Sequence, residues 1–118
     1  MAAEGETDTI FHKIMRKEIP ATFVYEDDKC IAIKDIAPVA PIHYLIIPRK
    51  TIPKLSKIEE EDEPLLGHLL YVAKKIARDE KLDNGFRIAI NDSHHACQTV
   101  FQLHLHLIGG RQLSASMG

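Results

Sequence analysis

Two histidines close to the end of the chain, His104 and His106, are the residues best suited to chemistry. A neutral imidazole can attack phosphorus or move a proton at cellular pH, because its ordinary pKa lies near 6.5. Gln102 precedes them at the same spacing, in the run Gln102-Leu-His-Leu-His-Leu. Alternate residues of a β-strand share a face, so this run predicts a polar face of Gln102, His104 and His106 opposite a face of leucines.

Three interpretations of this polar row are open. The first is an ordinary solvent-facing strand. The second is a zinc site, which needs a third protein ligand, and Gln102 is a poor one. The third is nucleophilic catalysis, in which one imidazole attacks phosphorus while its neighbours hold the oxyanion and protonate the leaving group. The third requires no metal and no cofactor, and we expect neither.

The elements that must position this row follow from the spacing of apolar residues. We expect a short N-terminal helix, capped by Thr7 or Asp8 and ended by Pro20, and a long helix from Glu59. Strands are expected at residues 22–25, 30–33, 43–48, 86–91 and 100–108. The order predicts an α+β fold: a five-stranded, mostly antiparallel sheet with one short N-terminal helix and one long helix, both packed on one face.

Length and composition limit the class of protein. A chain of 118 residues, 45% of them apolar, predicts one domain, residues 8–118, after a flexible acidic tail, residues 1–7. The net charge of −2 and the pI near 6.4 give no basic field for nucleic acid. The sequence shows neither a targeting signal nor an apolar run that could span a membrane. Two cysteines fit reduced thiols, so we expect a cytoplasmic or nuclear location.

The segment Gln98-Thr-Val-Phe-Gln-Leu-His-Leu-His-Leu-Ile-Gly-Gly-Arg-Gln resembles the signature of the histidine triad family, in particular its nucleotide-binding phosphoramidase branch. The resemblance extends from about Asp8 to Gln112. It implies the histidine triad fold, a homodimer, and hydrolysis of a purine nucleoside monophosphate linked to an amine through a covalent nucleotidyl-histidine intermediate.

The resemblance also assigns catalytic roles. His104 matches the nucleophile, His106 a histidine that contacts the phosphate, and His43 a supporting histidine. Thr99 stands where relatives usually carry a serine whose hydroxyl serves the phosphate and the leaving group. Gln102 replaces the first histidine of the triad and cannot gain or lose a proton, so we expect activity that is present but reduced.

The nucleotide-binding residues implied by the resemblance are of two kinds. Asp35 matches the acid that holds the ribose hydroxyls, and Asn91 matches a residue that contacts the nucleotide near its phosphate. The apolar positions that match the purine pocket and its surroundings are Ile10, Phe11, Ile14, Ile36, Leu45 and Val100.

Two further segments depart from the family pattern. The loop of residues 92–98 contains His94, His95 and Cys97 where relatives commonly have glycines, which raises a metal or thiol hypothesis, although a solvated loop is favoured. Residues 113–118 lack the tryptophan that relatives carry in a tail reaching the neighbouring subunit's site. The sequence therefore does not predict the preference for the leaving group.

Three rival functions follow from the same residues. One is another histidine triad reaction, on dinucleoside polyphosphates or on adenylylated ends of nucleic acid, the latter disfavoured by the absence of a basic patch. Another is a nucleotide-binding or protein-interaction module with weak catalysis, which Gln102 would explain. The third is a zinc-binding regulator.

Overall fold

The computed structural model describes residues 7–118, and the tail predicted at residues 1–7 lies outside this range except for Thr7. Two α-helices are present, α1 (Ile10–Met15) and α2 (Glu63–Asp79). The strands are β1 (Phe23–Glu26), β2 (Cys30–Lys34), β3 (Ile42–Pro48), β4 (Phe86–Ala89) and β5 (Leu105–Gly109). Single 3₁₀ turns lie at η1 (Leu55–Lys57), η2 (Glu60–Asp62) and η3 (His94–Ala96).

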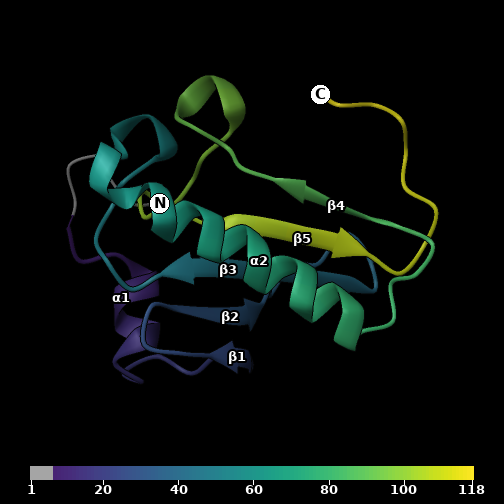
Figure 1. Ribbon diagram of the computed structural model, residues 1–118, viewed down its shortest axis with the longest axis horizontal. Coiled ribbons are helices and arrows are strands. Elements are labelled where there is room, and N and C mark those ends of the chain that lie inside the picture. The colour runs from purple at the N-terminus through teal and green to yellow at the C-terminus, as the bar shows by residue number, and fades with distance from the viewer. Residues whose placement is uncertain (1–6) are drawn as a thin grey trace.

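The strands form one sheet in the order β1-β2-β3-β5-β4, and every neighbouring pair is antiparallel (Figure 1). This confirms the predicted α+β fold and its five-stranded sheet. β5, the last strand in the chain, lies between β3 and β4. The segment that leads into β5 therefore runs beside the end of β3, which brings residues 99–104 close to the N-terminal helix and the central strands.

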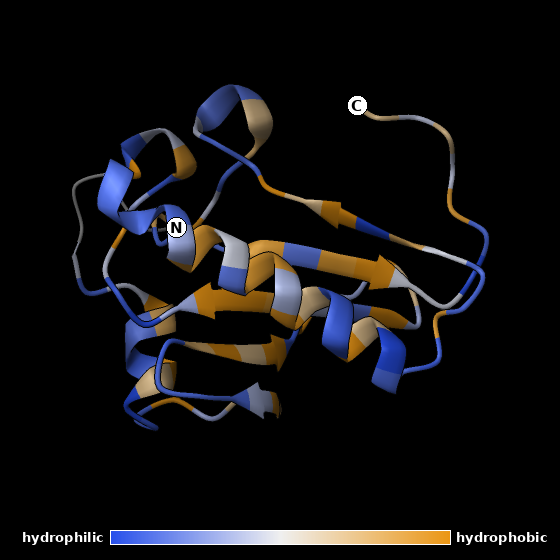
Figure 2. Ribbon diagram, in the orientation of Figure 1, coloured by the Kyte–Doolittle hydropathy of each residue, from blue (hydrophilic) through white to orange (hydrophobic). Residues whose placement is uncertain are grey.

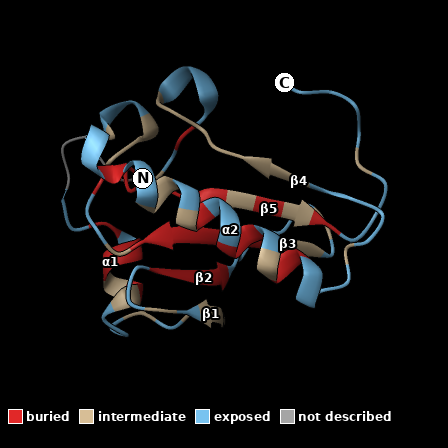
Figure 3. Ribbon diagram, viewed as in Figure 1, coloured by how far each residue is buried: buried red, intermediate tan, exposed pale blue. Residues whose placement is uncertain are grey.

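The two helices lie on opposite faces of the sheet, and the expectation that both cover one face is wrong. Tyr44 and Ile46 of β3 belong to the core cluster that contains the buried residues of α2. Leu45 and Ile47, the alternate residues of the same strand, belong to a second cluster with Phe11 and Ile14 of α1. β2 and β3 are therefore apolar and buried on both faces (Figures 2 and 3).

Among the strands and the long helix, three boundaries differ from the prediction by two residues or more. β5 begins at Leu105 instead of Val100, since its last pair with β3 joins Leu105 to Ile46. β4 ends at Ala89, where its pairing with β5 stops. The acidic residues after Glu59 form the turn η2, and the α-helix begins at Glu63. No helix within residues 7–118 is long and apolar enough to cross a membrane.

The N-terminal helix is capped by Thr9, not by Thr7 or Asp8. The Thr9 hydroxyl accepts a hydrogen bond from the Phe11 amide at 3.2 Å, and the Thr9 amide donates to Nδ1 of the buried His12 at 3.0 Å. This reciprocal pair satisfies amides that the first helical turn leaves free. Nε2 of His12 lies 3.1 Å from the Thr51 hydroxyl, which ties α1 to the segment after β3.

Replacing Thr9 with alanine should therefore lower the free energy of unfolding by about 0.5–2 kcal/mol, the usual cost of losing a capping hydroxyl. Chemical denaturation of Thr9→Ala and Thr7→Ala measures it. Thr7 is exposed and outside the helix, so its variant should be as stable as the wild type. A larger loss of unfolding free energy for Thr7→Ala than for Thr9→Ala would mean that Thr7 caps the helix, as predicted from the sequence.

Candidate active site

A cavity of about 350 Å³ lies between α1, the end of β2, the middle of β3 at Leu45, and the segment that leads into β5. Its wall is mainly apolar, and polar groups enter it at a few positions, which is typical of a site for an organic ligand. The predicted site residues that line it are Ile10, Phe11, Ile14, Asp35, Ile36, Leu45, Thr99, Val100, His104 and His106. Residues from opposite ends of the chain thus meet in one site.

His104 is held with one ring nitrogen bound to the backbone and the other left free. Its Nδ1 lies 2.8 Å from the carbonyl oxygen of Gln102, and because a carbonyl only accepts, Nδ1 must carry the hydrogen. Nε2 of the neutral ring then presents a lone pair, and no group within residues 7–118 hydrogen-bonds to it. The ring is 6% exposed and meets the edge of the Phe11 ring at 5.0 Å between centroids.

His106 is held by a chain of hydrogen bonds that begins at a backbone amide. The Val39 amide donates to Nδ1 of His43 at 3.1 Å, so the proton of neutral His43 is on Nε2. His43 Nε2 donates this proton to Nδ1 of His106 at 2.9 Å. An Asp35 carboxylate oxygen lies 3.4 Å from the same His43 Nε2. His106 must accept at Nδ1 and therefore carries its hydrogen on Nε2. This Nε2 is buried and has no hydrogen-bond partner among the described residues.

Burial keeps both cavity histidines neutral. It lowers the pKa of His104 below 6.5, against smaller opposing effects of the Gln102 carbonyl and the Asp35 charge. It also lowers the pKa of His106 to about 4, and the neighbouring His104 and His43 act in the same direction. The two rings lie 5.1 Å apart between centroids. The site thus sets a free Nε2 lone pair beside an unpaired Nε2 donor, the pair needed to attack an electrophile and hold its oxygen.

Of the other predicted residues, Asp35, Ile36 and Thr99 lie at the cavity and Asn91 does not. Asp35 lies at the cavity with one oxygen bound to the Ala37 amide at 2.8 Å, and Thr99 lines the cavity with its side chain exposed. Ile36 is 97% exposed at the rim. Asn91, half-buried after β4, is not among the residues that line the cavity. The structure thus places Asp35 and Thr99, but not Asn91, at the site.

Gln102 does not share a polar face with the histidines, which corrects the predicted row. It lies three residues before β5 begins, so the strand alternation on which the prediction rested does not apply. Its side chain is fully buried and bonds to three backbone groups of residues 48–52. It is absent from the cavity wall and cannot complete a zinc site with His104 and His106 there.

Sequence reasoning missed part of the cavity wall, namely Ile19, Pro20, Ala21, Ile33 and Lys34. Ile33 was accessible from the sequence, since pairing the predicted strands places it opposite Leu45. The contribution of Ile19 to Ala21 depends on how the chain leaves α1, which local pattern does not fix.

The comparison with protein families agrees with this geometry. The family model described as HIT domain matches residues 16–113. The chain belongs to the HIT domain family. It is 51% identical over 115 residues to adenylylsulfatase HINT1 of Arabidopsis thaliana, covering 96% of this chain and 78% of that protein. It is 55% identical over 109 residues to a 14 kDa zinc-binding protein of Brassica juncea, covering 91% and 96%.

Among solved structures, a HIT family hydrolase from Legionella pneumophila superposes with a TM-score of 0.90 at 44% identity, over 92% of this chain and 98% of that one. The histidine triad fold is therefore confirmed. A second hollow in this HIT domain, about 580 Å³ between the turn before β4 and residues 110–113, is larger, but its wall contains no histidine, cysteine or serine. The chemistry points to the smaller cavity.

Two clusters in the described part of this HIT domain bring three potential metal ligands together. In one, Asp35, His43 and His106, the two imidazoles already bond to each other. The other consists of Asp27, Cys30 and His68. Both oxygens of Asp27 already accept hydrogen bonds, one from the Lys29 and Cys30 amides and the other from Tyr25 and His68. Burial also raises the pKa of the Cys30 thiol to about 12, which opposes the thiolate a metal needs. This second cluster ties the β1–β2 turn to α2.

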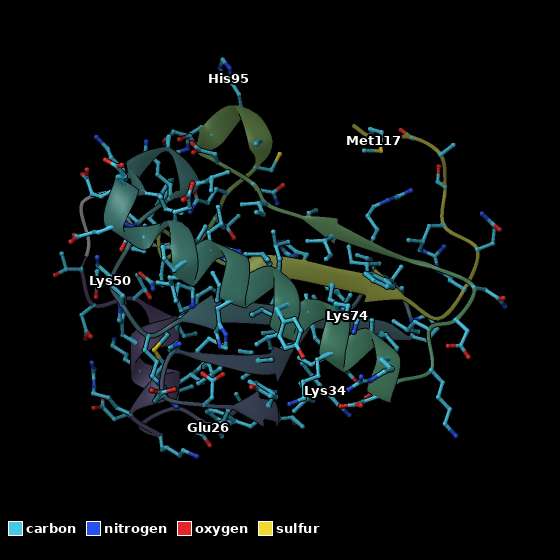
Figure 4. All side chains as sticks on the ribbon, in the orientation of Figure 1. Glu26, Lys34, Lys50, Lys74, His95 and Met117 are labelled. Carbon is cyan, nitrogen blue, oxygen red and sulfur yellow. The ribbon has the colours of Figure 1, made fainter. Side chains whose placement is uncertain are left out.

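The histidines of the loop before Thr99 do not form a site. His94 and His95 lie in the exposed turn η3, and the His95 side chain points away from the molecule (Figure 4). Ser93 and Cys97, at the two ends of that turn, have φ of 70° and 63°. Such positive φ values favour glycine, so both residues hold a backbone conformation that is unusual for residues with a side chain.

Proposed function

We propose that this protein is a nucleotide hydrolase that forms a covalent nucleotidyl intermediate on His104, and that it acts as a purine nucleoside phosphoramidase. The observation that carries the proposal is the pairing at the cavity: a neutral His104 with a free Nε2, beside a buried His106 Nε2 donor with no partner within residues 7–118. The names of the Arabidopsis and Legionella relatives, an adenylylsulfatase and a hydrolase, support the reaction class.

The proposed reaction has two displacements at phosphorus. Nε2 of His104 attacks the phosphorus, a P–N bond forms to the ring, and the P–N bond to the amine breaks as the departing nitrogen takes up a proton from the solvent. Nε2 of His106 donates to a non-bridging oxygen as charge builds up there. Water then attacks the same phosphorus and gives up a proton to the solvent, the bond to His104 breaks and restores its neutral ring, and the nucleoside monophosphate is released. In this proposal the Thr99 hydroxyl, at the cavity wall, hydrogen-bonds to the leaving amine.

The shape and lining of the cavity support the proposed substrate class. Its apolar wall, formed by α1 and the strands β2 and β3, suits a flat base, and Asp35 offers carboxylate oxygens at its edge for ribose hydroxyls. The purine preference, the homodimer and the cytoplasmic or nuclear location stay predictions of the family resemblance. The reaction on adenylylsulfate is a second candidate, favoured by the name of the Arabidopsis relative.

The weak-binder alternative depended on Gln102 as a lost acid or base. Because that side chain lies outside the cavity wall, its identity removes no proton-transfer group from the site. We therefore favour the enzyme over the binding module.

Steady-state hydrolysis of an adenosine phosphoramidate and of adenylylsulfate, with quenching in alkaline denaturant, which preserves a P–N bond to histidine, and mass analysis of the protein, tests the proposal. An adenosine monophosphate adduct on His104 with turnover of the phosphoramidate supports it. Turnover of adenylylsulfate alone moves the proposal to that substrate. Tight nucleotide binding with neither adduct nor turnover would show that the proposed hydrolase function is wrong.

The rate should depend on pH through His104. Since burial lowers the pKa of this ring below 6.5, kcat/KM should be constant near pH 8 and fall at lower pH with a midpoint below 6.5, as Nε2 gains a proton. A pH–rate profile measures this. Unfolding must be followed in parallel, because buried neutral histidines bind protons more readily when unfolded, so stability also falls below pH 6.5. An acid limb centred above pH 7 contradicts the assignment.

A further inference from the structure

The nucleophile proposed above lies on a segment that the sheet does not hold. The ladder between β3 and β5 ends at the pair of Ile46 and Leu105. Beyond this pair, β3 continues to Pro48 but pairs only with β2. His104 precedes the ladder, so no strand pairing fixes its backbone, and some other interaction must do so.

The side chain of Gln102 supplies that interaction. It is 0% exposed, and its amide makes every hydrogen bond for which it has hydrogens: Nε2 donates to the carbonyls of Pro48 at 3.0 Å and Lys50 at 2.7 Å. Oε1 accepts from the Ile52 amide at 3.0 Å. One backbone bond, from the Leu103 amide to the Ile52 carbonyl at 2.7 Å, adds to these. The segment before β5 is thus joined to residues 48–52 mainly through one side chain.

We propose that Gln102 is a positioning residue for the nucleophile: its buried amide fixes its own backbone, whose carbonyl oxygen sets the orientation and the tautomer of His104. The link is direct, since that carbonyl accepts the Nδ1 hydrogen of His104 at 2.8 Å. A ring held at Nδ1 presents Nε2 to the cavity. The inference rests on the proposed function for its effect on rate, but its effect on the tautomer is independent of any substrate.

The segment of residues 48–52 that Gln102 holds also contacts the opposite wall of the cavity. Thr51 lies in this segment, and its hydroxyl bonds to Nε2 of His12. Nδ1 of His12 in turn accepts from the Thr9 amide at the start of α1. α1 in turn carries Phe11, which meets the His104 ring edge-on. Gln102 therefore connects the nucleophile and the helix that faces it through residues 48–52.

The test replaces Gln102 with methionine, which has a similar length and no amide. We expect kcat for the adenosine phosphoramidate to fall about 10–100-fold, as a small misplacement of a reacting group does, while KM stays within about threefold. In ¹⁵N imidazole NMR, the wild-type His104 should be a single Nδ1–H tautomer, assigned by its loss in His104→Ala. In Gln102→Met, the signal should show a mixture of tautomers.

Gln98→Met is the matched control. Gln98 is also buried and also makes three bonds to backbone groups, with Ser93, Pro53 and Val100. It has no bond to His104, so its variant should lose a comparable amount of stability while His104 keeps the Nδ1–H tautomer. A mixture of tautomers in both variants would make the effect one of general loosening and overturn the proposal.

Gln102→His is the second variant and carries the test if the methionine variant does not fold. A neutral imidazole has one donor and one acceptor and can replace at most two of the three bonds. We expect turnover at or below that of the wild type, with a partial tautomer mixture. Turnover above wild type would mean that position 102 acts as an acid or base, and would overturn the positioning role. If the variants shift the His104 tautomer but the wild type shows no turnover, the positioning role of Gln102 is kept and the proposed function is wrong.

Discussion

Replacing His104 with alanine is expected to reduce turnover of a nucleoside phosphoramidate by about 10³-fold or more, as loss of a nucleophile does. The free Nε2 of this ring is the atom proposed to attack phosphorus, and no other described histidine presents an unpaired acceptor nitrogen to the cavity. Nucleotide affinity should change little, because the apolar wall stays in place. Initial rates and calorimetric titration with adenosine monophosphate measure the two quantities.

His95→Ala is the control for this experiment. His95 is exposed and points away from the molecule, so its removal should leave both rate and affinity unchanged. Retained turnover in His104→Ala together with its loss in Cys97→Ser would transfer the nucleophile to the loop. Loss of nucleotide affinity along with turnover in His104→Ala would assign the ring to binding only.

Replacing His106 with alanine is expected to lower kcat about 10²-fold with a small change in KM. Its Nε2 hydrogen is a buried donor without a partner within residues 7–118, and a donor aimed at developing oxyanion charge contributes about this much. The ring also accepts a hydrogen bond from His43 Nε2, so the variant leaves that donor without its acceptor. Steady-state kinetics should therefore be accompanied by thermal denaturation, which separates lost catalysis from lost stability.

His106→Gln is the informative partner of that variant. A glutamine amide provides both an acceptor for His43 and a donor for the phosphate, so part of the rate should return. If KM rises while kcat is unchanged in His106→Ala, the ring contributes equally to substrate and transition state, and its assigned role in the chemical step is wrong.

The fold was largely accessible from the sequence because its signals are local. The helical spacing of apolar residues marked α2, and short apolar runs between turn residues marked five strands, all of which are present. The sides on which the helices pack were not accessible. β2 and β3 are buried on both faces, so the two faces carry the same residue types and give no sign of which helix covers which.

The site was predicted in composition but not in geometry. Ten predicted residues line one cavity, and His43 reaches it through His106. Gln102 was misplaced because the alternating pattern continues past the point where strand pairing ends, and tertiary hydrogen bonds of its amide decide its direction. The pattern of residue types cannot reveal such an end, since β3 continues to Pro48 and the pairing stops where the segment before β5 bonds to residues 48–52 instead.

The hydrogens of the two cavity histidines are assigned by peptide groups: the carbonyl of Gln102 for one, and the amide of Val39, acting through His43, for the other. Replacement by any residue other than proline retains both groups. Alanine scanning would therefore pass over both groups, and residue 39 could vary freely during evolution while its amide stayed essential. Replacing the single peptide bond before Val39 with an ester, by chemical synthesis, would remove one hydrogen-bond donor and expose this hidden dependence.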